Sequence, residues 1–430
     1  MTILVFLGSL LGAMAMRIPV AFALMLAGVA LMIQLDTFDA QILAQNLIGG
    51  ADSFPLLAIP FFMLAGELMN AGGLSRRIVA LPMALVGHMR GGLGFVAIIA
   101  AIVMASLSGS AVADTAAVAA MLMPMMRKAG YDPNRSAGLI AAGGIIAPII
   151  PPSIPLVVFG VAGGVSITKL FMAGIVPGLM MGLALWGTWW WLARRSDLPV
   201  GKKASRAEVL RALRDGIWAL MLPVLIIGGL KLGIFTPTEA AAVAAVYALF
   251  VSLFVYRELK LRELYKVFLD AGRTTAVVMF LVAAALVSSW LMTIAELPML
   301  VSDLLEPIVD RPQLLLVVIM AIVLVVGTTM DLMPIVLILT PVFMPVIKLA
   351  GIDPVYFGIL FILNTSIGLI TPPVGNVLSV MSGVGKVPLD GCHHQLGEDD
   401  QQRQHSQVRE QKRQHATHHA IEWYLSLIHI

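Results

Sequence analysis

Apolar segments separated by short polar stretches make up most of the chain before residue 390. A helix rises about 1.5 Å per residue, so about 20 apolar residues are needed to cross the roughly 30 Å hydrocarbon core of a bilayer. The apolar stretch 216–256 is therefore long enough for two crossings. Residues 1–16 are short for a crossing, but they lack the basic start of a cleavable signal peptide, and we expect a retained first helix there.

Two apolar segments, 93–127 and 313–349, are too long for a single crossing. Each has about 35 residues, which as one helix would measure about 52 Å. Each is also interrupted near its middle by small and hydroxyl-bearing residues, which predicts a re-entrant hairpin with an irregular tip that protein or water must surround. The predicted tip residues are Ser106, Ser108, Gly109 and Ser110 in the first hairpin, and Gly327, Thr328, Thr329 and Asp331 in the second.

The segments that follow the hairpins, 136–160 and 356–381, have the length of one crossing but contain consecutive prolines. Proline lacks a backbone N–H and cannot continue a helix, so each segment is predicted to be a broken helix. Freed carbonyls and hydroxyl groups at a break suit a hard cation such as sodium, and the N-terminus of a half-helix attracts a carboxylate. The predicted break residues are Pro151, Pro152 and Ser153 in the first helix, and Thr371, Pro372, Pro373 and Gly375 in the second.

The helix-breaking residues recur at a fixed offset of 221 residues, which indicates an internal repeat. Asp132-Pro133 is matched by Asp353-Pro354, and Pro151-Pro152 by Pro372-Pro373. Breaks at corresponding places in two apolar halves are typical of secondary transporters whose site lies between two repeats. We expect a first repeat at 1–193, a linker at 194–215 and a second repeat at 216–390.

The charged connections between apolar segments predict how the chain is oriented. Residues 194–214 contain seven basic and two acidic side chains, and 257–273 form a second basic loop. A third connection, 295–311, has four acidic side chains and one arginine. Because Lys and Arg concentrate on the cytoplasmic side of membrane proteins, we expect the first two connections inside and the third outside. The repeats would then be inverted, with the first hairpin opening inward and the second outward.

The composition agrees with a membrane protein. Hydrophobic residues make up 59% of the chain and charged residues 12%, and the mean hydropathy is +0.93. This is more apolar surface than a soluble core can bury. Trp186 and the run 189–191 precede the basic linker, and we expect their rings at the level of the lipid headgroups. A Walker loop and spaced histidine ligands are both missing from the apolar body, so the sequence predicts a carrier and not an enzyme.

The polar segment 391–430 departs from this pattern. It holds Cys392, the single cysteine, and seven of the eight histidines. A metal-binding tail is one interpretation, but the abrupt loss of hydrophobicity favours a frameshift or an artefactual addition. We expect this tail to be disordered.

Several polar residues in apolar surroundings have two interpretations each. Asp114 and Asp331 are ion ligands or buried helix caps, since an ionisable residue within a membrane is a functional hypothesis by default. Residues 108–110 are ligands or small residues that allow close helix packing; their match with the second tip favours ligands. Asn364 and Thr365 line the cavity beside the second break, or they form hydrogen bonds between helices.

Three motifs carry a family resemblance that covers roughly residues 1–390. They are Gly233-Ile-Phe-Thr-Pro-Thr-Glu-Ala-Ala-Ala242, in which Thr236 and Glu239 are spaced as a helix capping box, Ile150-Pro-Pro-Ser-Ile-Pro155, and Thr371-Pro-Pro-Val-Gly-Asn376. These stretches resemble the signatures of the large membrane subunit of tripartite ATP-independent periplasmic (TRAP) transporters, the DctM-like family.

The resemblance implies an all-α polytopic membrane protein of the elevator-type ion transporter superfamily, with two inverted repeats that each contain a hairpin and a broken helix. It implies import of a small organic acid, such as sialic acid or a C4-dicarboxylate, with sodium as the coupling ion and no covalent cofactor. The implied partners are a periplasmic substrate-binding protein and a small four-helix membrane subunit in the bacterial inner membrane, and no nucleic acid. Two alternatives stay open, a stand-alone sodium-coupled anion symporter and an ion channel.

Overall fold

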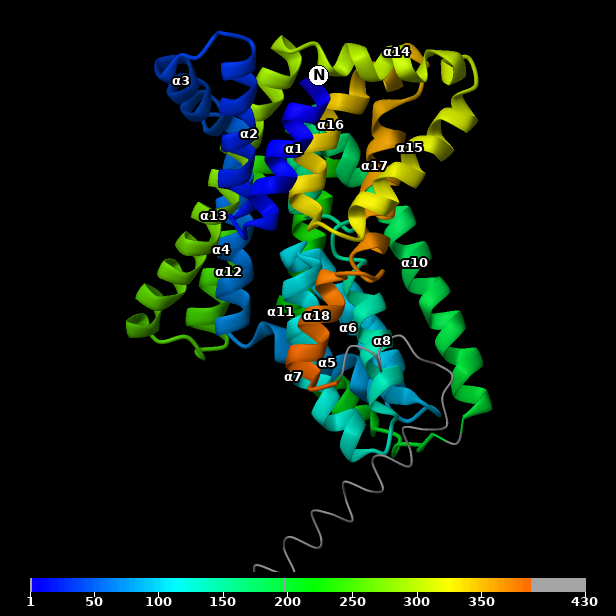
Figure 1. The fold of residues 1–430 in the computed structure, drawn as a ribbon. Coiled ribbons are helices and arrows are strands. Elements are labelled where there is room, and N and C mark those ends of the chain that lie inside the picture. The colour runs from blue at the N-terminus through cyan, green and yellow to red at the C-terminus, as the bar shows by residue number, and fades with distance from the viewer. Residues whose placement is uncertain (1, 197, 388–430) are drawn as a thin grey trace, which may run out of the picture. The chain divides into compact units, whose positions relative to one another are not determined.

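The computed structural model describes residues 2–196 and 198–387, and within these ranges the chain forms helices and no β-strand (Figure 1). Among the described residues, six helices are long and apolar enough to cross a membrane. This is the fold of a polytopic membrane protein. Of the two compact units into which the chain divides, Met1–Val387 holds all of these helices; the predicted tail at 391–430 lies outside the described residues.

The helices of the first half run from the N-terminus to the basic linker. They are α1 (Thr2–Ala15), α2 (Val20–Gln34), α3 (Ala40–Ala51), the short 3-10 helix η1 (Phe54–Leu57), α4 (Ala58–Ala71), α5 (Leu74–Val86), α6 (Gly92–Ser108), α7 (Ala111–Lys128), α8 (Pro133–Gly144), α9 (Ile154–Gly163) and α10 (Ile167–Arg195).

The helices of the second half follow the linker. They are α11 (Arg206–Lys231), α12 (Pro237–Phe250), the π-helical turn η2 (Val251–Val255), α13 (Leu261–Ile294), α14 (Leu297–Val309), α15 (Pro312–Gly327), α16 (Leu332–Leu349), α17 (Pro354–Gly368) and α18 (Asn376–Gly385). The capping box predicted at the start of α12 is confirmed, because Thr236 and Glu239 each accept a hydrogen bond from the other's backbone N–H.

Helix boundaries in the two halves follow the 221-residue offset. Helices α7 and α16 each have 18 residues and begin at Ala111 and Leu332. Helices α8 and α17 begin alike, because Asp132 and Asp353 each cap the helix that starts with the next proline. The carboxylates accept from the backbone N–H of Arg135 at 2.7 Å and of Tyr356 at 2.8 Å. The repeated Asp-Pro pairs therefore fix equivalent helix starts.

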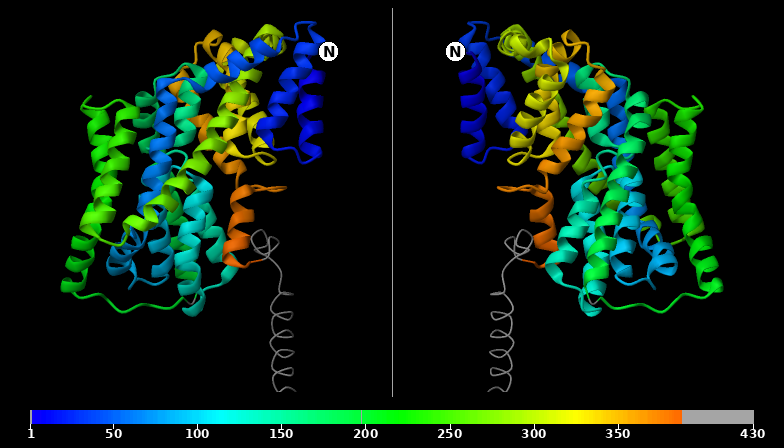
Figure 2. Two further views of the ribbon diagram at one scale, coloured as in Figure 1. Left: turned by 90° about the vertical axis from the view of Figure 1, so that its left-hand side faces the viewer. Right: turned by 90° about the vertical axis from the view of Figure 1, so that its right-hand side faces the viewer.

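The two halves pack crosswise. Helix α9 packs against α16 and α17, and α18 packs against α7 and α8, which are the corresponding helices of the other half. In Figure 1 the hairpin α6–α7 lies in the lower part of the view and the hairpin α15–α16 in the upper part, and Figure 2 shows the same division from two sides. Arg127 at the end of α7 donates hydrogen bonds to the carbonyls of Gly385 and Lys386. These bonds cap the C-terminus of α18.

The remaining long helices form a second layer of crosswise contacts. Helix α4 packs against α12, and α2 packs against α13. Ser288 donates a hydrogen bond of 2.7 Å to the carbonyl of Leu24, and Gly28 lets the side chain of Leu291 approach closely. The hydrogen bond of Ser288 and the small size of Gly28 allow α2 and α13 to pack closely, and small residues are common at contacts between membrane helices.

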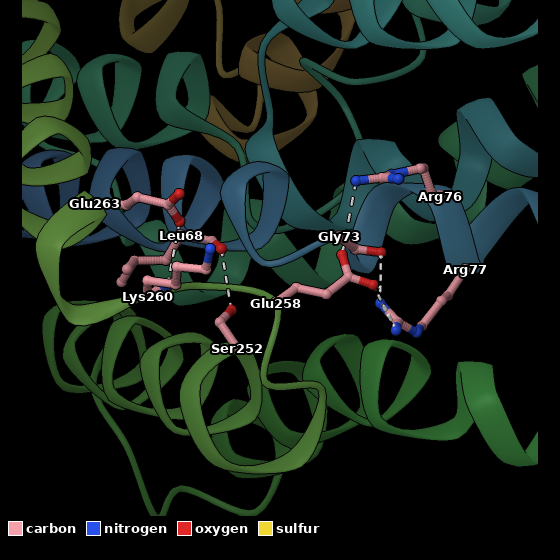
Figure 3. A network of polar contacts seen from close by, with 8 residues as sticks. All are labelled: Leu68, Gly73, Arg76, Arg77, Ser252, Glu258, Lys260 and Glu263. Carbon is pink, nitrogen blue, oxygen red and sulfur yellow. Dashed lines mark hydrogen bonds and ion pairs between the residues drawn. The ribbon is translucent and has the colours of Figure 1, made fainter.

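A polar network joins the corner between α4 and α5 to the connection that follows η2 (Figure 3). Glu258 accepts from Arg77 at 2.7 Å, and the guanidinium of Arg77 lies 3.8 Å above the ring of Tyr256. Ser252 in η2 donates to the carbonyl of Leu68 at the end of α4, at 3.1 Å. Gly73, with φ of 72°, leaves the space that the Glu258 carboxylate occupies. The network fixes the direction in which the chain leaves α4.

The expectation for the tryptophans is wrong in part. Trp189 is buried and donates to the carbonyl of Gly91 at 2.9 Å, because Gly94 leaves room for its ring against α6; it does not face the headgroups. Trp190 and Trp191 are exposed and stack under Arg194 and Arg195, at 3.7 and 3.9 Å. The connection at 295–311 is mostly helix α14, whose Leu297 and Leu305 are buried while its acidic side chains point outward.

Candidate functional site

In the first hairpin tip, residues 108–110, the serine side chains form hydrogen bonds with groups of the same hairpin. Helix α6 ends at Ser108, Gly109 adopts φ of 62°, and Ser110 caps α7 by accepting from the backbone N–H of Ala113 at 3.4 Å. The Ser108 hydroxyl donates to Asp114 Oδ1 at 2.5 Å and accepts from the backbone N–H of Ser110 at 3.2 Å. Glycine adopts this left-handed backbone at no steric cost.

The first tip lies directly against the first break, residues 145–153. A Cβ atom on Gly109 would lie 2.4 Å from the carbonyl oxygen of Pro152 and 2.9 Å from the Cα of Ser153. Ser153 caps α9 by accepting from the N–H of Leu156 at 3.3 Å, and donates to the carbonyl of Pro148 at 2.5 Å. Backbone atoms of the hairpin and the broken helix are therefore in contact, which the sequence alone could only suggest.

The second tip, residues 328–331, and the second break, residues 369–375, are held together in a similar way. The backbone N–H of Val374 donates to the carbonyl of Thr328 at 3.2 Å. A Cβ atom on Gly368, the last residue of α17, would lie 2.6 Å from the carbonyl carbon of Gly327. Both the Pro151-Pro152 and the Pro372-Pro373 bonds are cis. Each half thus places its own hairpin tip against its own proline break.

Unused carbonyl groups line both breaks. Among the described residues, the carbonyls of 150–152 in the first break and of 371–373 in the second accept no hydrogen bond. Hard monovalent and divalent cations prefer such oxygen ligands. Within the described ranges, clusters of three or more His, Cys, Asp or Glu side chains are missing, so a metal ion bound there would take most of its ligands from backbone and hydroxyl oxygens. Such a donor set suits a hard cation.

The two tip regions differ in burial. Every residue from Ile145 to Ser153 is buried, as is Asp114 beside the first tip. In the second break Pro372 and Pro373 are exposed, and so is Asp331 at the tip, where its Oδ1 accepts from the N–H of Leu332 at 2.9 Å. Asp331 is a helix cap in this structure, whereas Asp114 is enclosed by protein.

Most other predicted site residues donate their hydroxyl protons to carbonyls of the same chain segment. Asn364 is different, because its amide donates to the carbonyl of Met320 on α15 at 2.6 Å, which is the hydrogen bond between helices that its sequence allowed. The hydroxyls that donate to a carbonyl three or four residues earlier are those of Ser106, Thr328, Thr329, Thr365 and Thr371. Their oxygen lone pairs stay available, and their role as ligands stays a prediction.

Three residues at these contacts were missed by the sequence interpretation. Gly66 on α4 lies 3.8 Å from the Ser108 side chain, measured from the position of a Cβ atom. Gly144 makes room for Thr115 beside the first tip, and Gly368 makes room for Gly327 at the second. Glycine in an apolar helix often marks close approach of a neighbour, and this signal could have found Gly144 and Gly368.

Comparisons with known proteins agree with this architecture. Residues 7–397 match the family described as tripartite ATP-independent periplasmic transporter, DctM component. The chain is 66% identical over 390 residues to the 2,3-diketo-L-gulonate TRAP transporter large permease protein YiaN of Escherichia coli. The aligned region covers 91% of this chain and 92% of that protein. It is 42% identical over 347 residues to the C4-dicarboxylate TRAP transporter large permease protein DctM of Pseudomonas aeruginosa, covering 81% of each chain.

A third relative is named for a different substrate. The sialic acid TRAP transporter large permease protein SiaM of Vibrio cholerae is 40% identical over 378 residues, covering 88% of each chain. The fold and these matches define a transporter subunit of the membrane and not an enzyme. The chain belongs to the DctM family, the large permease subunits of TRAP transporters.

Proposed function

We propose that this subunit imports a small organic acid by coupling its movement to sodium ions. The observation that carries the proposal is the pairing of each hairpin tip with a proline break whose carbonyls accept no hydrogen bond from the described residues. Such breaks join carbonyl oxygens, which bind cations, to half-helix N-termini, which favour a carboxylate. Two tip and break pairs would supply sodium sites on either side of one anion site.

The proposed mechanism places the halves in opposite orientations as inverted repeats. The crosswise packing of α9 on α16 and α17, and of α18 on α7 and α8, supports this arrangement, because in each half the helix that follows the proline break packs against the other half. The elevator class proposed for the family would move the two hairpins and broken helices together as one body. Helices α2, α4, α12 and α13, which pack on one another, would form the stationary layer.

The site residues would act through two kinds of contact. Ser108, Thr329 and the carbonyls of both breaks would bind sodium, and the amide ends of α9 and α18 would face the substrate carboxylate. The half-helix α9 begins at Ile154 after its cap, and α18 begins at Asn376 after Gly375, whose φ is 52°.

The substrate proposal rests on the named relatives. All three are named for transport of organic anions, and the 66% identical relative is named for 2,3-diketo-L-gulonate. We propose a sugar acid of this type as the first substrate to test. TRAP large permease subunits work with a small membrane subunit and a periplasmic binding protein, so we propose both as partners, in the bacterial inner membrane.

The proposal predicts sodium-driven accumulation in proteoliposomes that contain this chain and its small subunit, with the binding protein outside. A tenfold sodium gradient supplies about 1.4 kcal/mol per ion, enough for about tenfold accumulation for each coupled ion. Labelled 2,3-diketo-L-gulonate should accumulate under an inward sodium gradient and saturate with concentration. A potassium gradient of equal size is the control. Equal uptake with both ions would contradict sodium coupling, and uptake without the binding protein would contradict the proposed delivery.

A further inference from the structure

Helix α10, the last helix of the first half, has two faces of different composition. Its inner face packs against α6, α8 and α9 and carries three buried glycines four residues apart, Gly174, Gly178 and Gly182. An added Cβ atom would clash with the carbonyl oxygen of Ile149 at Gly174, and with the side chain of Ile102 at Gly182. Glycines at this spacing let membrane helices approach closely. The opposite face of α10 is therefore left to the surroundings of the protein.

The outer face of α10 changes from apolar to aromatic to basic along the helix, which lies at the edge of the bundle in Figure 1. Its exposed residues recur every three or four positions, a spacing that places them on one side of a helix. From the first to the last the helix rises about 27 Å, close to the roughly 30 Å of a hydrocarbon core. The residues of this outer stripe are Val176, Met180, Leu183, Gly187, Trp190 and Arg194, with Trp191 and Arg195 beside the last two.

The basic end of the outer stripe holds two guanidinium groups in fixed positions. Arg194 lies 3.7 Å above the ring of Trp190, and Arg195 lies 3.9 Å above the ring of Trp191. Among the described residues neither guanidinium forms an ion pair. Stacking on a ring leaves the N–H groups at the edge of a guanidinium available to an acceptor. Two neighbouring positive groups are thus oriented at the surface without an anionic partner from these residues.

The order of chemistry along the outer stripe matches the order within one phospholipid molecule. An acyl chain fits apolar side chains, the glycerol region lies at the depth that tryptophan rings favour, and a phosphate accepts paired hydrogen bonds from arginine. Clusters of basic residues at the cytoplasmic end of a membrane helix favour anionic headgroups. A soluble acidic partner would use the two arginines but not the apolar part of the stripe. An anionic phospholipid fits all three parts.

We propose that the outer stripe of α10 binds an anionic phospholipid in the leaflet next to the basic linker. The phosphate would lie between the guanidinium groups of Arg194 and Arg195, and an acyl chain would follow the apolar part of the stripe. Because α10 also packs against α6, α8, α9 and α17, the lipid would bind to the helices that carry the first hairpin and the proline breaks. The proposal does not depend on sodium coupling or on the identity of the substrate.

The test measures lipid binding without transport. The Tm of the purified full chain in detergent is followed while phosphatidylglycerol or phosphatidylcholine with the same acyl chains is added. A ligand that binds only the folded state raises Tm according to the ratio of its concentration to its Kd. The wild type should reach a given rise in Tm at a lower concentration of phosphatidylglycerol than of phosphatidylcholine. In Arg194→Gln/Arg195→Gln the concentration of phosphatidylglycerol needed for that rise should increase by at least about tenfold, because two basic contacts to the headgroup are lost.

The matched control is Arg206→Gln/Arg211→Gln, which removes two exposed arginines from α11 and changes the net charge equally. It should keep the wild-type response to both lipids. An equal response of the wild type to the two lipids, or an unchanged response in Arg194→Gln/Arg195→Gln, would overturn the proposal. An equal loss in the control would overturn it too, because net charge would then explain the effect. Loss of the small membrane subunit from the purified complex, without a change in the lipid response, would assign this face to a protein partner instead.

A second variant decides the matter if Arg194→Gln/Arg195→Gln does not fold. Trp190→Leu/Trp191→Leu keeps both charges and the apolar character of the stripe but removes the rings that orient the guanidinium groups. The concentration of phosphatidylglycerol needed for the same rise in Tm should increase by at least about threefold, since two exposed cation–π contacts are lost. The response to phosphatidylcholine should stay the same. An unchanged response to phosphatidylglycerol would contradict the role of the stacked arginines.

Discussion

Replacing Gly109 by alanine is expected to reduce sodium-coupled uptake by at least about tenfold while the protein still inserts into the membrane. The new methyl group would lie 2.4 Å from the carbonyl oxygen of Pro152, so the first tip must move away from the first break. Overpacking of this kind costs about 1 to 3 kcal/mol when neighbouring atoms must shift. The uptake rate per molecule of inserted protein, measured in proteoliposomes, tests the prediction.

Gly164→Ala is the matched control for this variant. Gly164 has φ of 64°, close to the 62° of Gly109, but an added Cβ atom would meet no atom within 4 Å. Both variants carry the same cost of a side chain in the left-handed region, roughly 1 kcal/mol. Only Gly109→Ala adds the clash with the break. Equal loss of uptake in the two variants would show that backbone strain, and not the contact between tip and break, causes the effect.

Replacing Gly368 by alanine should damage the second half to a comparable degree. The added atom would lie within 2.8 Å of the Cα, the carbonyl carbon and the oxygen of Gly327, all of which are backbone and cannot rotate away. We expect α15 and α17 to separate, a lower Tm, and uptake reduced by at least about tenfold. Thermal unfolding of the purified chain and uptake by proteoliposomes measure the two effects.

Gly138→Ala serves as the control for the second half. Gly138 lies in α8, the helix that corresponds to α17, and an added Cβ atom would meet nothing within 4 Å. Alanine is favoured over glycine in a helix by up to about 1 kcal/mol, so this variant should keep or slightly raise Tm. A normal Tm and normal uptake in Gly368→Ala would contradict the close contact between α15 and α17.

The features that the sequence predicts well are those fixed by local chemistry. Proline cannot continue a helix, so the interruptions at 151–152 and at 372–373 follow from the residues alone. The Asp-Pro pairs at 132–133 and 353–354 predict helix starts, because the carboxylate caps the helix and proline favours its first turn. The Thr236 capping box follows in the same way. Such signals need no knowledge of distant neighbours.

The features that the sequence does not reveal depend on distant contacts. Trp189 is buried because Gly94, far away in sequence, leaves space for its ring. Asp114 and Asp331 look alike as acidic residues in apolar segments, yet one is enclosed and the other exposed. Gly327 and Gly368 are in close contact and bring α15 and α17 together, but in the sequence each position shows only a glycine and not its partner. Burial and contact at these positions arise from the packing of whole helices.

The central claim, that the two halves have opposite orientations, is tested most directly by the sidedness of two connections. Lys203 in the basic linker and Asp303 on α14 are both exposed, and each can be replaced by cysteine in a chain whose Cys392 has been changed to serine. In intact cells an impermeant thiol reagent should label cysteine at 303 and leave cysteine at 203 unlabelled until the membrane is opened. Equal labelling of both positions in intact cells would contradict the inverted arrangement.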